Sequence, residues 1–307
     1  MQPSARSVKE KSLAWGKRTY LMGVLNITPD SFSGDGLLAE EVGKMGEGDR
    51  LARIRAQARD FVASGADILD VGGESTRPGS VPVGAAEEIE RVVPVIKALA
   101  KELETSSGLD FLISVDTYKA EVAAEALKAG AHIVNDVWGL KADPQLASLV
   151  AAHRVPIILM HNRSSWAHAE LKERLGGRYV GVPYEDLLED IKRELLESVE
   201  LAHEGGVSDE QIILDPGIGF GKTVEQNLEL LDRTNEIREL GYPVLVGPSR
   251  KSFIGYTLDL PPDQRLEGTA AAVVIAIVRG ADIVRVHDVG FISRVVRMAD
   301  AIVRRKT

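Results

Sequence analysis

Clusters of polar and charged residues follow eight short apolar runs in this 307-residue chain. They occupy residues 26–33, 72–79, 116–119, 135–136, 160–163, 215–222, 247–252 and 285–288. A single aspartate after a strand is usually a helix N-cap, and that alternative stays open for Asp116 or Asp136 taken alone. Helix capping accounts for one such aspartate better than it accounts for a polar cluster after every one of the eight runs. The pattern therefore predicts that the clusters converge on one ligand-binding site.

Four cationic or titratable side chains follow the last two runs. Arg250 and Lys251 follow the seventh run, and Arg285 and His287 end the eighth. Arginine presents a planar fork of donors that matches phosphate oxygens, and residues two apart on a strand share one face. We predict an anion site here. The alternatives are a solvated surface pair for Arg250 and Lys251 and a structural role for His287.

Oxygen-bearing side chains complete the set. Asp116, Asn135 and Asp215 supply carboxylates and an amide. Buried groups of this kind suit a flat ligand with N–H and C=O groups along one edge, because they reject ligands that leave them unpaired. Mg²⁺ prefers oxygen ligands, often one or two from the protein together with substrate phosphates. Asn26 and Asp30 fit such a site, although an Asx-Pro turn without a ligand is an equal alternative.

Three other motifs have less support. Residues 216–223 read PGIGFGKT, one residue away from a phosphate-binding loop, but proline stands where that motif begins with glycine. The same glycines have the wrong final spacing for a dinucleotide fingerprint, and no acidic residue ends the next run to hold a ribose. No G-x-S-x-G segment supports a triad hydrolase. The absence of cysteine excludes disulfides, thiolate metal sites and cysteine nucleophiles.

The apolar runs are the elements that must position these clusters. We predict strands at residues 20–25, 67–71, 111–115, 132–134, 156–160, 211–214, 243–246 and 283–286. Continuous apolar runs are typical of strands buried on both faces, as in a parallel sheet covered by helices. Helical stretches lie between them, and Gly65, Gly130 and Gly280 are expected to end three of these helices in the left-handed conformation. The alternation favours a single (β/α)₈ TIM barrel with its active site at the C-terminal ends of the strands, over an open doubly wound sheet.

The chain shows no linker that would divide it. We predict an N-terminal extension at residues 1–18 and one barrel domain at residues 19–307. Pro94 should kink the helix predicted around it or mark the true start of that helix. The segments 34–49 and 162–183 are the least regular, and in a barrel both would lie on the active-site face. Segment 162–183 is also basic and long, and its role stays open.

The net charge and the apolar runs of the chain narrow the classes of partner that we expect it to bind. Lys and Arg total 37 and Asp and Glu total 46, so the net charge is −9. This balance argues against a nonspecific nucleic-acid binder, which needs a basic surface. The first 17 residues lack the apolar core of a signal peptide, and the longest apolar run, 270–278, is too short to span a bilayer. We predict a cytoplasmic protein that binds neither nucleic acid nor membrane.

Together these segments resemble the dihydropteroate synthases, a (β/α)₈ family of folate biosynthesis, from about residue 20 to residue 294. The motifs that carry the resemblance are MGVLNITPDSFS at 22–33, DVGGESTRPG at 70–79, ISVDTYK at 113–119, NDVWG at 135–139, DPGIGFGK at 215–222, SRKSFIG at 249–255 and RVHDV at 285–289. Several long motifs in the family's order are highly specific. One departure is Asp35, which stands one position away from the acidic residue that the family commonly has, so its role stays open.

The resemblance implies a reaction and a pterin pocket. Family members condense 6-hydroxymethyl-7,8-dihydropterin diphosphate with 4-aminobenzoate, giving 7,8-dihydropteroate and diphosphate by an SN1-like loss of Mg²⁺-bound diphosphate. By matched positions, Asp116, Asn135, Asp215 and Lys251 resemble the groups that bind the pterin edge. Met160 resembles the residue that packs on the pterin face.

The remaining roles follow in the same way. Asn26 resembles the Mg²⁺-linked residue, and Arg285 and His287 resemble the diphosphate anchors, so these three and Lys251 are the implied catalytic residues. The region implied to meet 4-aminobenzoate comprises Thr76, Arg77, Pro78 and Ser252. The family also implies a homodimer. The alternatives are a pterin-barrel methyltransferase that passes a methyl group to a corrinoid, and a catalytically silent pterin-binding homologue.

Overall fold

The computed structural model describes residues 13–27, 47–76, 80–105, 109–165, 169–172, 174–179 and 181–305. Eight parallel strands form one sheet in the order β8-β5-β4-β3-β2-β1-β10-β9. The strands are β1 (Tyr20–Asn26), β2 (Ile68–Gly72), β3 (Leu112–Asp116), β4 (Ile133–Asp136), β5 (Ile157–Met160), β8 (Ile212–Asp215), β9 (Leu245–Val246) and β10 (Ile283–Val286). A parallel bridge between Leu214 and Val244 joins the two edges. The predicted barrel is therefore confirmed, and the open doubly wound alternative is wrong.

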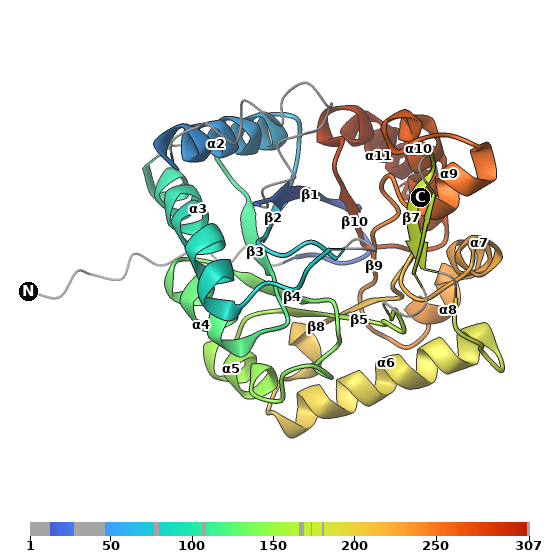
Figure 1. The fold of residues 1–307 in the computed structure, drawn as a ribbon, viewed down its shortest axis with the longest axis horizontal. Coiled ribbons are helices and arrows are strands. Elements are labelled where there is room, and N and C mark those ends of the chain that lie inside the picture. The colour runs from blue at the N-terminus through green and yellow to red at the C-terminus, as the bar shows by residue number, and fades with distance from the viewer. Residues whose placement is uncertain are drawn as a thin grey trace, which may run out of the picture.

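Helices surround the strands on all sides (Figure 1). They are α2 (Glu47–Ala63), α3 (Ala85–Thr105), α4 (Ala120–Lys128), α5 (Leu146–His153), α6 (Leu187–Glu204), α7 (Val224–Asp232), α8 (Thr234–Arg238), α9 (Ser252–Leu258), α10 (Leu266–Val278) and α11 (Val289–Val303). Short 3₁₀ turns lie at Asp209–Gln211 and Pro262–Gln264. Pro94 lies inside α3, so it does not mark the start of that helix. The three glycines expected after helices, Gly65, Gly130 and Gly280, all have the predicted positive φ.

Several strands end later than the sequence predicted. Asp116, Asp136 and Asp215 are the last residues of β3, β4 and β8, whereas the predicted strands stopped one or two residues earlier. The parallel ladder continues through them, because backbone pairing does not depend on the polarity of the side chain. Strand β9 is shorter than predicted, since Pro243 has no N–H to donate and pairs only through its carbonyl with Leu214.

The interior of the barrel has an apolar floor. Inward-facing side chains near the N-terminal ends of the strands form one buried cluster, made of Tyr20, Met22, Ile68, Ile133, Ile158, Ile213, Leu245 and Ile283. Leu13 and Trp15 pack against it from the segment before β1. Because side chains alternate along a strand, positions two residues further on also face inward. Those positions include Asp70, Asn135, Met160, Asp215 and Arg285, so a largely polar layer lies above the floor.

A second, larger core lies between the outer face of the sheet and the helices. In α6, five apolar residues spaced three or four apart are all buried: Leu188, Ile191, Leu195, Val199 and Ala202. This packing fixes each helix against its strand and so fixes the loops that leave the C-terminal ends of the strands. No helix in the described part of the chain is long and apolar enough to cross a membrane. The predicted cytoplasmic location and the division at residue 18 stay predictions.

An antiparallel hairpin after β5 was not predicted from the sequence. Strands β6 (Ala169–Lys172) and β7 (Gly176–Tyr179) form this separate two-stranded sheet within the segment 162–183. The hairpin is too short and too polar to show the apolar runs by which the barrel strands were recognised. Figure 1 shows β7 beside α9, outside the ring of barrel strands.

Candidate active site

An arginine links two carboxylates above the apolar floor. Arg285 on β10 donates from Nε to Asp70 Oδ2 and from Nη2 to Asp116 Oδ2, both at 2.6 Å. Asn135 on β4 donates from Nδ2 to the same Asp70 oxygen at 3.1 Å. Asp70 is fully buried on β2. The structure thus joins residues from four strands into one hydrogen-bonded layer.

The electrostatics of this layer follow from its burial. Loss of solvent raises the pKa of Asp116 to about 7, although the positive charge of Arg285 opposes the shift. Burial alone would lower the pKa of Arg285, but Asp70 and Asp116 outweigh it and raise that pKa. Arg285 therefore stays charged, whereas Asp116 titrates near neutral pH. The ionisation of Asp116 is thus sensitive to any change in the position of Arg285.

A carboxylate and an ammonium group also lie at this end of the barrel: Asp215 ends β8, and Lys251 lies in the loop after β9. Asp215 is buried, accepts a 2.7 Å hydrogen bond from the amide of Gly217, and has a pKa raised by burial against the opposing charge of Lys251. Lys251 Nζ donates to the carbonyl of Ile218 and lies 4.5 Å from the ring centroid of Phe220. Loss of solvent lowers the pKa of Lys251 to about 8. Near neutral pH, Lys251 is therefore a cationic donor.

Asn26 and Met160 lie at the same end of the barrel. Asn26 is the last residue of β1, and a Cβ at Gly72 would lie 3.7 Å from its Oδ1 and 3.5 Å from Asp116 Oδ2. The bare backbone of Gly72 thus keeps a space open between an amide oxygen and a carboxylate. Met160 is buried at the end of β5 and pairs with Asp215 in the strand register. Both residues border the polar layer.

The four cationic or titratable residues predicted to form an anion site divide into two groups. His287 is held by Ser249, whose Oγ lies 3.0 Å from Nδ1 and accepts from the His287 amide at 3.1 Å. Arg250 turns away and donates from Nε to Asp288 at 2.8 Å on the exposed rim. The surface alternative therefore fits Arg250, whereas its neighbour Lys251 is half-buried and belongs to the polar layer.

A buried ionic chain lies behind the β8 loop. Lys222 Nζ lies 2.9 Å from Gly217 O, 3.0 Å from Phe220 O and 2.9 Å from His161 Nδ1. The other ring nitrogen of His161, Nε2, lies 3.1 Å from Glu194 Oε2. Burial lowers the pKa of His161 to about 3 and that of Lys222 to about 7. A neutral His161 that donates to Glu194 and accepts from Lys222 satisfies every contact, so the chain braces the loop that carries Phe220.

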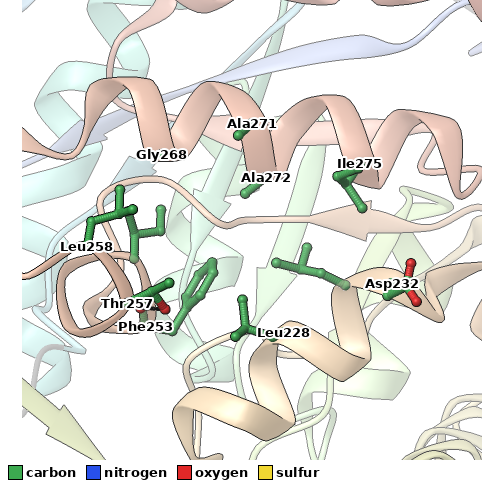
Figure 2. Close-up of a pocket in the computed structure, with 11 residues that line it drawn as sticks. Leu228, Asp232, Phe253, Thr257, Leu258, Gly268, Ala271, Ala272 and Ile275 are labelled. Carbon is green, nitrogen blue, oxygen red and sulfur yellow. Dashed lines mark hydrogen bonds between the residues drawn. The ribbon is translucent and has the colours of Figure 1, made fainter.

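An apolar cavity of about 330 Å³ lies elsewhere, between α7, α9 and α10. Figure 2 shows Leu228 of α7, Phe253 of α9 and Ile275 of α10 around the same space. Its lining has few polar groups, which does not suit a ligand with hydrogen-bonding edges or phosphates. The candidate active site is therefore the polar layer at the barrel mouth.

The pterin binding enzyme family model matches residues 22–287, which span the barrel from β1 to β10. The chain belongs to the pterin-binding enzyme family. Dihydropteroate synthase of Bacillus subtilis is 49% identical over 304 residues, which cover 99% of this chain and 93% of that relative. The relatives thus match the whole barrel.

Solved structures agree with this assignment. A Clostridium difficile dihydropteroate synthase, crystallised in the presence of pteroic acid, matches with a TM-score of 0.81 and 48% identity over 95% of this chain and 99% of that one. The Xanthomonas albilineans enzyme with 4-aminobenzoic acid matches with a TM-score of 0.79 and 37% identity over 93% of each chain. The family, the barrel and the dihydropteroate synthase activity predicted from the sequence are confirmed.

In this pterin-binding enzyme, most of the residues predicted from the sequence meet at the barrel mouth. Asn26, Asp116, Asn135, Met160, Asp215, Lys251, Arg285 and His287 all lie at or just after the C-terminal ends of strands. Thr76 follows β2, and Ser252 opens α9. Arg77, Pro78, Asp30 and Asp35 lie outside the described residues.

Sequence reasoning missed Asp70 and Lys222. Asp70 is the only carboxylate within the apolar run 68–72. Ile68, two residues earlier on the same strand, faces the interior of the barrel. That alternation was a usable signal for an inward-facing acid. Lys222 ends the motif DPGIGFGK, but nothing in the motif indicates that its ammonium turns back into the protein to contact His161.

Proposed function

We propose that the polar layer at the barrel mouth is the site where 6-hydroxymethyl-7,8-dihydropterin diphosphate reacts with 4-aminobenzoate. The observation that carries this proposal is the layer itself: Asp215, Asn135 and Asp116 surround an apolar-floored mouth that also holds Lys251 and Arg285. A pterin has amino, N–H and C=O groups along one edge, which match such a set of donors and acceptors. Diphosphate is the anion that the arginine would meet.

The hydrogen-bonding groups along the pterin edge pair with protein donors and acceptors that neighbouring residues hold in place. Asp215 is oriented by the amide of Gly217, so its other oxygen can accept from the amino and N–H groups of the ligand. Lys251 would exchange its bond to the Ile218 carbonyl for the pterin carbonyl. Asn135 is held by Asp70 and offers an amide with both donor and acceptor. Met160 would cover one face of the ring, since a thioether packs well against an aromatic system.

Arg285 and His287 anchor the diphosphate. The bonds to Asp70 and Asp116 use two of the five N–H groups of an arginine, so the others can face the leaving group. As the C–O bond lengthens, negative charge grows on the diphosphate, and a positioned cation stabilises that charge. Ser249 fixes the ring of His287, which orients its far nitrogen towards the same anion.

Asn26 is the proposed Mg²⁺ ligand. Its amide oxygen is a hard, neutral donor beside the open space at Gly72, and the described residues hold no cluster of three or more acidic or histidine ligands. A single protein oxygen suits a Mg²⁺ ion whose other ligands are water and substrate phosphates. When bound, Mg²⁺ would neutralise charge on the diphosphate oxygens and make the diphosphate a better leaving group.

The second half of the reaction needs little from the protein. The electron-rich dihydropterin delocalises the positive charge left at its methylene after the C–O bond breaks. The amine of 4-aminobenzoate then forms the C–N bond and loses a proton to solvent. Thr76, Arg77, Pro78 and Ser252 are proposed to hold 4-aminobenzoate for this attack. No strong protein nucleophile is required, in keeping with a chain that has no cysteine.

One assay tests the proposal against its alternatives. Purified protein is supplied with both substrates and Mg²⁺, and dihydropteroate and diphosphate are measured with and without 4-aminobenzoate. Dihydropteroate formation is expected. A protein that binds pterin without forming product would be a silent homologue, and methyl transfer to a corrinoid would identify a methyltransferase. Asp215, Lys251 and Arg285, whose loss would mark a silent homologue, are all present.

A homodimer is also proposed. Phe291, Met298 and Ile302 of α11 stand exposed, and they line one pocket together with Val295 of α11 and Val274 of α10. A contiguous exposed apolar patch is typical of a protein interface. Light scattering should give about twice the mass of one chain. A monomer at all working concentrations would contradict this part of the proposal.

A further inference from the structure

The β6–β7 hairpin and the segment just after it contact the loops that leave β2 and β8. On the side facing β2, the Tyr179 hydroxyl donates to the carbonyl oxygen of Thr76 at 3.3 Å. Beyond the hairpin, the amide of Val182 donates to the carbonyl of Gly221, in the loop after β8, at 3.3 Å. These two contacts link the segment to two of the loops that leave the C-terminal ends of the barrel strands.

A buried arginine anchors the turn of the hairpin. Arg265 is 3% exposed and donates to the carbonyls of Leu175 at 2.7 Å, Arg250 at 3.0 Å and Leu260 at 3.2 Å. Leu175 lies in the hairpin turn, and Arg250 lies in the loop after β9. A Cβ at Gly255 would come within 2.1 Å of the guanidinium, so the bare backbone of α9 makes room for this contact. The turn is thus tied to the scaffold through buried, charge-assisted hydrogen bonds.

The strands of the hairpin dock on α9 as well. The guanidinium of Arg178 stacks 4.1 Å above the ring of Tyr256, and Arg174 donates to the carbonyl of Asp259 at 2.8 Å. Arg178 also pairs across the hairpin with Glu170 at 2.7 Å. These contacts fix β7 and therefore fix the direction in which Tyr179 points.

The hydroxyl of Tyr179 is suited to holding the backbone of the loop after β2 in place. Its side chain is buried, and burial raises the pKa of its hydroxyl, which therefore stays protonated and able to donate at neutral pH. Its acceptor is a backbone oxygen, so the hydrogen bond constrains the path of the chain itself. Thr76 is the residue at which the β2 loop enters the segment assigned to 4-aminobenzoate under the proposed function.

We propose that Tyr179 is a positioning residue for 4-aminobenzoate: the docked hairpin presents its hydroxyl to the Thr76 carbonyl and so sets the β2 loop for that substrate. This inference rests on the proposed function for its substrate. It also assigns a role to the segment 162–183, which the sequence left without one. The residues proposed to bind the pterin edge lie on β3, β4 and β8 and in the loop after β9, so we expect the affinity for pterin not to depend on this contact.

Tyr179→Phe tests the inference, because it keeps the ring and removes only the hydroxyl, which donates to Thr76 and also has a hydrogen bond with Ser164. The KM for 4-aminobenzoate should rise about threefold to tenfold, the range expected for one hydrogen bond. The KM for the pterin diphosphate should stay within about twofold. Tyr256→Phe is the matched control: that phenol lies under the same hairpin, and its hydroxyl has no hydrogen-bond partner among the described residues. Neither KM should change in the control.

A second readout does not depend on catalysis. Backbone amides at 72–76, 80, 81 and 83 should exchange hydrogen faster in Tyr179→Phe than in the wild type, and Tyr256→Phe should leave them unchanged. If the wild type forms no dihydropteroate, the proposed function fails, while the exchange comparison still decides whether Tyr179 holds the loop. Unchanged exchange, an unchanged KM for 4-aminobenzoate, or an equal rise in both KM values overturns the inference.

Discussion

Arg285 and Asp116 form a 2.6 Å ion pair across the barrel mouth, although 169 residues separate them in the chain. The pair joins the side of the site proposed for diphosphate to the side proposed for pterin. Because Arg285 lowers a pKa that burial raises, the charge on Asp116 depends on where the guanidinium lies. If diphosphate binds to Arg285 as proposed, it would therefore alter the charge of the carboxylate proposed to face the pterin and so couple the two halves of one substrate.

Arg285→Lys should lower kcat/KM by about 10²–10³-fold, the loss typical of removing a preorganised group that stabilises developing charge. A lysine ammonium cannot span Asp70 and Asp116 and also offer a planar fork to the diphosphate. Steady-state kinetics measure the effect. The control is Arg250→Lys, whose partner Asp288 lies on the exposed rim, and its kcat/KM should stay close to wild type. A loss of less than about tenfold in Arg285→Lys would contradict the assigned role.

Asp215→Ala should weaken pterin binding by more than about tenfold, which is roughly 1.4 kcal/mol. The carboxylate is buried and oriented by Gly217, so its removal leaves ligand N–H groups without an acceptor. Isothermal titration with a pterin lacking diphosphate isolates this contact from Mg²⁺. Asp209→Ala, which removes an exposed acid far from the barrel mouth, serves as the control. Affinity retained within that factor would show that the pterin binds elsewhere.

The pH profile of kcat/KM should be bell-shaped. Asp116, with a pKa of about 7, gains its charge as pH rises, and Lys251, with a pKa of about 8, loses its charge as pH rises further. Both charges coexist only between these values, so kcat/KM should fall on either side. Lys251→Arg should move the basic limb to higher pH, because a guanidinium stays protonated. A basic limb that does not move in this variant would assign it to another group.

Removal of Mg²⁺ by a chelator should abolish dihydropteroate formation and leave the binding of a pterin without diphosphate unchanged. Asn26→Ala should raise the Mg²⁺ concentration needed for half-maximal rate by about tenfold, within the range seen when one ligand or its support is lost. Met160→Leu, which changes the pterin face and no oxygen ligand, is the matched control and should keep the wild-type Mg²⁺ requirement. If Asn26→Ala needs the same Mg²⁺ concentration as the wild type for half-maximal rate, Asn26 is not a ligand of the metal.

Local patterns in the chain determined the architecture. Continuous apolar runs separated by amphipathic stretches predict buried parallel strands, and eight of them give a barrel. The same spacing placed Asn135, Asp215 and Arg285 at one end, because every strand of a parallel barrel ends on the same face. The strand boundaries were less well predicted: Asp116 and Asp215 continue the ladder, since backbone pairing tolerates a polar side chain at the last position.

Only the tertiary structure decided which of these groups touch. The partners of Arg285, the inward turn of Lys222 to His161, and the contact of Tyr179 with Thr76 each join residues from separate elements. Such contacts depend on closure of the barrel and on the docking of the hairpin, which no periodicity along the chain encodes. The sequence thus determined the residue types available at the mouth, while the folded barrel determined their pairing and, through burial, their charge.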